Sequence, residues 1–288
     1  MLLEDTLFGT KDLVKISIDR LKAFEPSEGY YLAFSGGKDS QVVYHLAKEA
    51  GVKFDAHYNI TGIDPPELVY FIRKNYPDVL RDIYKESIFK MIPKRGLPTR
   101  LSRYCCSVLK EHGGEGRICV TGVRWEESSQ RKSRKPFEIF TEKKVDRKLF
   151  NDNDNDRRLF ENCMQKGKRM VNPIIDWSLG DVWQYLNSRN IEHCILYDQG
   201  YSRLGCIGCP MAGNRKEEFM KNPKIYDGFV RAMERFQLKY IERCEKNNKK
   251  PFRNTAQEWM EWWLLLYTKT DKLVEGQMDI FEDDWTSE

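Results

Sequence analysis

Two groups of residues in this chain have the types and spacing that chemistry requires. The first is Ser35–Ser40, with the sequence SGGKDS, at the point where a short apolar run meets a helical pattern. Gly36 and Gly37 would let the backbone approach a phosphate closely, and the helix that follows offers free N–H groups and the positive end of its dipole. Lys38 adds a cation. These residues predict a phosphate-binding loop, with an ordinary glycine-rich turn as the alternative.

Asp39 is an unusual neighbour for a phosphate because its carboxylate would repel it. It fits better as a Mg²⁺ anchor or as a helix-capping group. The loop is not a Walker A loop, which has a longer spacing between its first glycine and its Gly-Lys pair.

The second group consists of cysteines. Cys105 and Cys106 are adjacent, and Cys206 and Cys209 are separated by two residues. A disulfide between neighbouring cysteines is strained, whereas four thiols in two pairs suit zinc or an iron–sulfur cluster. The vicinal pair makes zinc the less natural choice, and four unrelated buried thiols are the alternative. Of the other cysteines, Cys119 lies in a predicted buried strand and is expected to be a core residue. We expect a structural role for Cys163, Cys194 and Cys244. The alternative for each of these three is a redox thiol.

Composition excludes several classes of protein. The 288 residues are 40% hydrophobic and 32% charged, with a net charge of +4, which argues against a disordered chain and against a small disulfide scaffold. Neither a run of about 18 apolar residues nor a signal peptide is recognisable. We therefore expect a soluble, cytoplasmic protein.

The small net charge hides two opposite blocks. Ser128–Met170 carries 13 Lys or Arg and 7 Asp or Glu, a net of +6, whereas Glu275–Glu288 carries 6 acidic and no basic residues, a net of −6. The basic block suits a polyanionic target such as nucleic acid, with a solvated lid loop as an equal alternative.

Strand and helix patterns alternate in the first half of the chain and predict an α/β fold, a doubly wound and mostly parallel sheet with a helical C-terminal extension. We expect an N-terminal helix within residues 1–28, a nucleotide-binding domain over 29–212 with a basic insertion near 128–170, helices over 213–274 and an acidic tail over 275–288. The predicted strands are Tyr30–Phe34, Lys53–Ile60, Val79–Ile83 and Arg117–Thr121, and the predicted helices are Leu13–Phe24, Lys38–Ala50, Glu67–Asn75, Asp181–Arg189, Lys216–Cys244 and Thr255–Thr268.

The SGGKDS loop resembles the PP-loop of the adenine nucleotide α-hydrolase superfamily, and the chain is similar in particular to the phosphoadenosine phosphosulfate (PAPS) reductase family. Further matches follow the loop: Thr61-Gly62 in the second-strand motif, and Gly122-Val123-Arg124 with Arg131 after the fourth predicted strand. The resemblance implies binding of ATP, or of PAPS or adenosine phosphosulfate (APS), with Mg²⁺. The implied nucleotide-binding residues are Ser35, Gly36, Gly37, Lys38, Asp39, Ser40, Thr61, Gly62, Gly122, Arg124 and Arg131, of which Lys38, Asp39 and Arg124 are the expected catalytic residues.

The cysteine pattern is similar to the 4Fe–4S signature of cluster-bearing sulfonucleotide reductases. This resemblance implies that Cys105, Cys106, Cys206 and Cys209 bind a 4Fe–4S cluster, with the cation of Lys110 close to it. The chain departs from these reductases at its C-terminal end, where their Glu-Cys-Gly-Leu-His tail is missing.

Three functions follow from these features. The preferred one is cleavage of ATP at the α-phosphate coupled to iron–sulfur-dependent sulfur transfer, with nucleic acid as one acceptor. The others are reduction of PAPS or APS by an unconventional thiol, and nucleotide binding without turnover in a defence or modification complex. Gln277–Phe281 resembles a peptide that binds the replication sliding clamp, with a strand or an unstructured end as the stronger alternative.

Overall fold

The computed structural model describes residues 2–6, 9–110, 113–140, 149–150 and 168–266. It divides into two compact units, the first formed by residues 1–87 and 105–206 and the second by residues 88–104 and 207–288. None of the helices in these described ranges is both long enough and apolar enough to span a membrane. The predicted sliding-clamp peptide, the acidic tail, Cys163 and much of the basic block lie outside the described residues.

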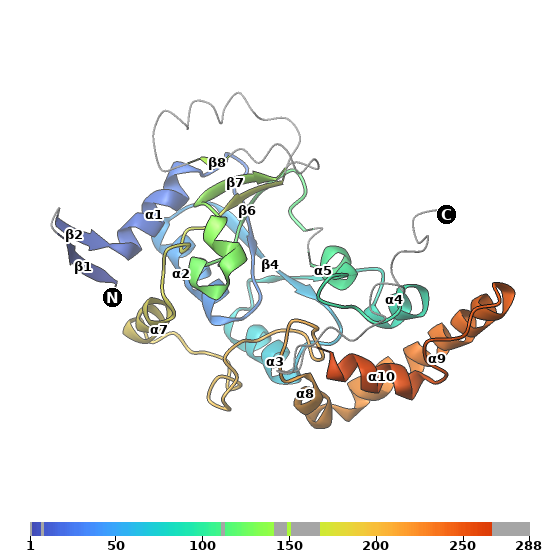
Figure 1. The fold of residues 1–288 in the computed structure, drawn as a ribbon. Coiled ribbons are helices and arrows are strands. Elements are labelled where there is room, and N and C mark those ends of the chain that lie inside the picture. Colours follow the sequence, from blue (N-terminus) through green and yellow to red (C-terminus); the bar gives the residue numbers. More distant parts are fainter. Residues whose placement is uncertain (1, 7–8, 111–112, 141–148, 151–167, 267–288) are drawn as a thin grey trace. The chain divides into compact units, whose positions relative to one another are not determined.

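The first unit contains a seven-stranded sheet (Figure 1). Pairing is parallel from the first to the fifth strand across it and antiparallel at the last two. Across the sheet the strands are β5 (Leu80–Ile83), β4 (Phe54–Ile60), β3 (Tyr30–Ala33), β6 (Ile118–Val120), β9 (Lys168–Val171), β7 (Phe137–Phe140) and β8 (Leu149–Phe150).

Chain order across the sheet defines the position of a binding site. The chain runs outward from β3 to β4 and β5 and then returns to β6 on the other side of β3. Ligands of open α/β sheets bind beyond the carboxyl ends of the strands where the order reverses in this way. The residues that follow β3 and β6 are the predicted phosphate loop and the predicted Gly122–Arg124 motif.

The helices of the first unit confirm the predicted α/β class. They are α1 (Leu13–Ala23), α2 (Lys38–Ala50), α3 (Pro66–Asn75), α5 (Tyr104–Leu109, which begins at the unit boundary) and α7 (Leu179–Ser188), with 3₁₀ turns η1 (Trp125–Glu127) and η2 (Ser129–Ser133). Helix α2 packs between α1 and α7. It buries Val42, Val43 and Leu46 and ends at Gly51, whose φ of 69° forms a left-handed cap.

Two parts of the first unit differ from the sequence prediction. Residues 2–12 precede α1 and contain the hairpin strands β1 (Leu3–Thr6) and β2 (Gly9–Asp12), which were not expected. The block predicted as a basic insertion contains β7 and β9, which belong to the main sheet. Phe137 and Val171 of these strands are fully buried, so hydrophobic burial outweighs the surrounding basic residues there.

The second unit is helical, as predicted for the C-terminal region. It contains α4 (Ile88–Arg95), α8 (Arg215–Lys221), α9 (Pro223–Lys246) and α10 (Ala256–Leu265). The single helix predicted over Lys216–Cys244 was wrong, because Pro223 starts a new helix after Asn222. Helix α9 packs against α4 and α10, with Phe229 stacked on Trp263 at a centroid distance of 5.8 Å.

Candidate functional site

The phosphate loop is closed by hydrogen bonds between its own serines. Ser40 Oγ donates to the carbonyl of Gly37 at 2.8 Å and accepts from the N–H of Ser35 at 3.2 Å. Gly36 has a φ of 71°, and a Cβ placed there would lie 2.7 Å from Ile72 of α3. The loop therefore requires glycine at this position for both its backbone conformation and its packing.

Lys38 is the first residue of α2 and is almost entirely buried, with 6% of its surface exposed. Its backbone N–H donates to the hydroxyl of Tyr197 at 2.9 Å. Its ammonium group donates to the carbonyl of Ser202 at 3.2 Å and lies 3.3 Å from Asp39. The predicted phosphate-binding cation is thus held in place by the segment that follows α7.

Arg124, which is buried, forms an ion pair with the half-buried Asp39. Arg124 Nε donates to Asp39 Oδ1 at 2.7 Å, while its Nη1 donates to Glu126 at 2.9 Å and to the carbonyl of Trp177 at 3.3 Å. Only 3% of Arg124 is exposed. Because both oxygens of Asp39 face cations, its carboxylate does not fit a Mg²⁺ site as it stands; it orients Arg124 and Lys38.

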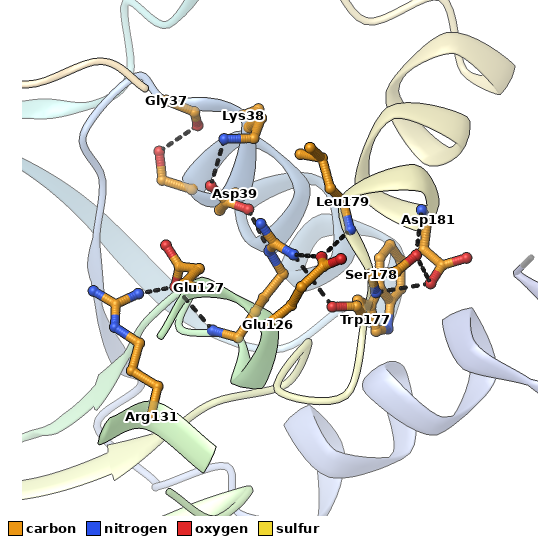
Figure 2. A network of polar contacts seen from close by, with 12 residues as sticks. Gly37, Lys38, Asp39, Glu126, Glu127, Arg131, Trp177, Ser178, Leu179 and Asp181 are labelled. Carbon is orange, nitrogen blue, oxygen red and sulfur yellow. Dashed lines mark hydrogen bonds and ion pairs between the residues drawn. The ribbon is translucent and has the colours of Figure 1, made fainter. Parts of the chain in front are cut away.

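Two carboxylates of η1 hold the arginines of the site (Figure 2). Glu126 accepts from Arg124 and also from the N–H of Leu179 in the first turn of α7. Glu127 pairs with Arg131 and accepts from the N–H of Arg124 at 3.1 Å. Glu126 and Glu127, which lie in the same turn, therefore orient both of the arginines that were predicted to bind phosphate oxygens.

Positive charge accumulates around Arg131. Burial lowers the pKa of Arg131, and the charges of Arg203 and Arg134 lower it further. The guanidinium group remains charged, because the ordinary pKa of arginine is far above neutral. Such a concentration of cations would attract an anion with several phosphates.

Gly122 and Thr61 lie in different surroundings. A Cβ on Gly122 would lie 2.9 Å from the backbone of Asp39, so this glycine allows the end of β6 to approach α2 closely. Thr61 is buried, and its hydroxyl lies 3.5 Å from Cys206 Sγ. Its neighbour Gly62 has a φ of 79°. The Thr61 hydroxyl therefore contacts a cysteine in this structure. Nucleotide binding by Thr61 and Gly62 stays a prediction.

Around Cys206 the structure brings together several of the residues predicted for the cluster. Cys206 Sγ lies 3.9 Å from Asp64, and burial raises the pKa of this thiol. Lys110 retains exposed surface, yet protein atoms crowd its ammonium group. Crowding lowers the pKa of Lys110, but its interactions with Cys206 and Asp64 outweigh this, so that the pKa stands above its ordinary value. A cation beside thiolates favours an anionic cluster.

The donor set fits an iron–sulfur cluster in its chemistry. Cys105, Cys106 and Cys206 lie in the first unit and form no disulfide, and Cys206 and Cys106 both act electrostatically on Lys110. Cys209 belongs to the second unit. Within the described residues, no three His, Cys, Asp or Glu side chains are grouped closely enough to bind a metal ion. The cluster therefore stays a prediction.

Three residues of the site were missed by sequence reasoning. Tyr197 reaches the phosphate loop from a segment about 160 residues away, and Glu126 joins Arg124 to the first turn of α7; nothing in their local pattern signals either contact. Asp64 could have been found, because it lies three residues after Thr61 and accepts from its N–H at 2.9 Å. It places a carboxylate in the turn that follows β4.

Comparison with known proteins is consistent with this geometry. Residues 29–212 match the model of the phosphoadenosine phosphosulfate reductase domain. An uncharacterized protein of Methanocaldococcus jannaschii is 28% identical over 212 residues, which are 71% of this chain and 47% of that protein. A probable FAD synthase of Schizosaccharomyces pombe is 33% identical over 85 residues, 30% of this chain and 29% of that protein.

Shorter and structural similarities involve sulfonucleotide reductases. An adenosine 5'-phosphosulfate reductase of Oceanobacillus iheyensis is 44% identical over 39 residues, 14% of this chain and 16% of that protein. The crystal structure of phosphoadenylyl-sulfate reductase from Candida auris shares 17% identity, with a TM-score of 0.45 over 66% of this chain and 87% of that chain. The chain spans less than half the length of the first curated relatives it matches, 47% and 42%. Since the family model covers most of the chain, this protein belongs to the phosphoadenosine phosphosulfate reductase domain family.

Proposed function

We propose that this protein binds ATP, as its Mg²⁺ salt, on the loop Ser35–Ser40 and cleaves it between the α- and β-phosphates. The observation that carries the proposal is the buried network of Lys38, Asp39 and Arg124. It holds two cations in fixed orientations at the N-terminal end of α2, where the helix dipole also favours an anion. Preorganised cations of this kind stabilise charge that develops during phosphate-bond cleavage.

The proposed reaction is a substitution at the α-phosphorus of ATP, in which no group is oxidised or reduced. An acceptor oxygen attacks the α-phosphorus, the bond from this phosphorus to the α–β bridging oxygen breaks, and pyrophosphate leaves with the electron pair. Lys38, on the phosphate loop, would neutralise the leaving pyrophosphate. Arg124 would contact the α-phosphate with the edge of its guanidinium that Asp39 and Glu126 leave open.

The names of relatives support adenylyl transfer. Relatives named probable FAD synthase match 30% and 62% of this chain. An adenylyltransferase releases pyrophosphate in the manner proposed here. The matched stretches are partial, so the acceptor in this protein is part of the proposal.

Sulfur transfer is the second half of the proposal. Cys105, Cys106, Cys206 and Cys209 would hold a 4Fe–4S cluster, which when bound would supply the sulfur that replaces the adenylylated oxygen, and this oxygen would leave as part of AMP. The role of Lys110 would be to keep a positive charge beside these thiolates. The basic block Ser128–Met170 would bind a nucleic-acid acceptor.

Reduction of APS or PAPS is the second candidate, because relatives with that activity match over short stretches. It requires an accessible thiolate. Cys194 and Cys244 are both buried, and burial raises the pKa of Cys194, which disfavours either as the nucleophile. A nucleotide-binding subunit without turnover is the third candidate.

A product assay separates these functions. The full chain is incubated anaerobically with ATP and Mg²⁺, and separately with APS or PAPS and reduced thioredoxin. AMP or an adenylylated acceptor with pyrophosphate supports the proposal, sulfite supports the reductase, and nucleotide binding with neither product supports the non-catalytic subunit. Lys38→Ala should abolish the products, whereas Lys22→Ala, at an exposed position of α1, should not.

An iron analysis tests the cluster independently. Anaerobically purified protein should contain about four irons per chain and absorb broadly in the visible range. A colourless protein with one zinc would contradict the cluster, whatever the product assay shows.

A further inference from the structure

Tyr197 occupies a hydrogen-bonding position that a bound phosphate would otherwise use. The first N–H groups of a helix have no partner within the helix and commonly bind anions. At the start of α2, the N–H of Lys38 instead donates to the hydroxyl oxygen of Tyr197 at 2.9 Å. The side chain comes from a turn after α7, about 160 residues further along the chain.

The ring of Tyr197 is fixed by its neighbours. It packs edge-on against Trp183 of α7 at a centroid distance of 5.1 Å and against His193 at 6.1 Å. The ammonium group of Lys38 lies 5.6 Å from the ring centroid. These contacts hold the hydroxyl against the loop, where a Cβ on Gly37 would lie 3.5 Å from it.

The hydroxyl proton of Tyr197 has no acceptor among the residues that the structure describes. The hydroxyl oxygen accepts a hydrogen bond from the N–H of Lys38, and within the described residues this is the hydrogen bond that the hydroxyl makes. Burial raises the pKa of Tyr197 above its ordinary value of 10.0, and so the group stays protonated at neutral pH. A protonated hydroxyl beside a phosphate loop can donate to a phosphate oxygen.

We propose that Tyr197 is a phosphate ligand, whose hydroxyl donates a hydrogen bond to the pyrophosphate portion of the nucleotide. This inference rests on the proposed function, in which Lys38 neutralises the leaving pyrophosphate. Because Tyr197 is hydrogen-bonded to the N–H of Lys38 and lies beside its ammonium group, it faces the same phosphate. The hydroxyl links the helix N–H to the anion and adds a neutral donor to the cations of the loop.

The test compares three ligands on the full chain. Inorganic pyrophosphate, ATP and AMP are titrated calorimetrically into wild-type protein, into Tyr197→Phe, and into the matched control Tyr70→Phe, whose ring on α3 is 70% exposed. A hydrogen bond to a charged group contributes enough free energy for an expected loss of roughly tenfold or more in affinity. Tyr197→Phe should therefore bind pyrophosphate and ATP at least tenfold more weakly. AMP should bind equally to all three proteins, which also shows that the variant is folded.

Equal or tighter binding of pyrophosphate by Tyr197→Phe overturns the inference and leaves the proposed function intact. Tighter binding would mean that Tyr197 only blocks the loop. If wild-type protein binds neither pyrophosphate nor ATP, both proposals fail. If it binds both ligands but releases no pyrophosphate from ATP, the proposed reaction fails, while the role of Tyr197 is still decided by the titration.

Discussion

The first unit contains two buried or half-buried charge networks that differ in how they are assembled. One is the phosphate-loop network around Arg124. The other is a strand cluster, in which His57 of β4 contacts Asp82 at 2.8 Å and Asp55 at 2.6 Å, and Arg117 forms a two-pronged ion pair with Asp55. The strand cluster joins β4 to its neighbour β5 and to the residue before β6, over at most 62 residues, whereas the loop network joins segments up to about 160 residues apart.

The charge balance of the two networks also differs. In the strand cluster, one arginine and one histidine face two aspartates. Around the loop, carboxylates orient the cations, yet the positive charges of Arg203 and Arg134 still act on Arg131. The strand cluster, whose two aspartates are held by Arg117 and the His57 ring, has the character of a structural element, and the cation-rich network that of a binding site. Variants in each network test this distinction.

The largest effect is expected for Arg124→Lys. Lysine keeps the charge but loses the fork that contacts Asp39, Glu126 and the carbonyl of Trp177 together. We expect the rate of ATP cleavage to fall roughly 100-fold, in line with the loss of one preorganised donor. Steady-state kinetics measure this, with Arg73→Lys on the exposed face of α3 as the control. A rate within twofold of wild type would remove Arg124 from the site.

Gly36→Ala should come next, because it acts on the loop backbone itself. The added Cβ would meet Leu68 and Ile72 at 2.8 and 2.7 Å, in a left-handed conformation that alanine disfavours. We expect a loss of about 2 kcal/mol in unfolding free energy, together with weaker ATP binding. Chemical denaturation provides the measurement. Gly180→Ala, in α7, should be neutral or slightly stabilising, since its Cβ would lie 3.6 Å from the nearest atom.

Glu126→Gln should have a smaller, functional effect. The amide retains the shape of Glu126 but weakens its pairing with Arg124, so the guanidinium is less well oriented. We expect about a tenfold lower kcat with little change in unfolding free energy, since this side chain is 54% exposed. Comparison with Glu115→Gln, an exposed residue of the same unit, controls for the lost charge. Equal loss in both variants would show that Glu126 contributes only general electrostatics.

Asp55→Asn should affect stability alone. Its hydrogen bonds with Arg117 lower the pKa of Asp55 to about 2, below the 3.8 of the unfolded chain. The stabilisation is therefore complete above about pH 4 and disappears as pH falls through about 2. Because the Asp55 side chain is 40% exposed, solvent reduces it to about 1 kcal/mol. The difference in unfolding free energy between wild type and Asp55→Asn should therefore be smaller at pH 2.5 than at pH 7, as measured by denaturation curves. ATP cleavage at pH 7 should be unchanged.

Elements with local signals were predicted well from the sequence. The helix predicted over Lys38–Ala50 has those bounds in the structure, because glycines at both ends and a regular apolar face define it locally. Strands β7 and β9 were missed, since short strands inside a charged block are formed by pairing with distant neighbours. The split between α8 and α9 was missed although Pro223 marked it.

The sequence by itself determined the phosphate loop, its lysine and aspartate, and the cysteine pattern, because these depend on residue type and on spacing along the chain. Only the tertiary structure decided which distant groups hold the cations of the site: Asp39 for Arg124, and Tyr197 and Ser202 for Lys38. Asp39 and Arg124 meet because the strand order reverses between β3 and β6. Contacts made by folding distant segments together leave no periodic pattern in the sequence.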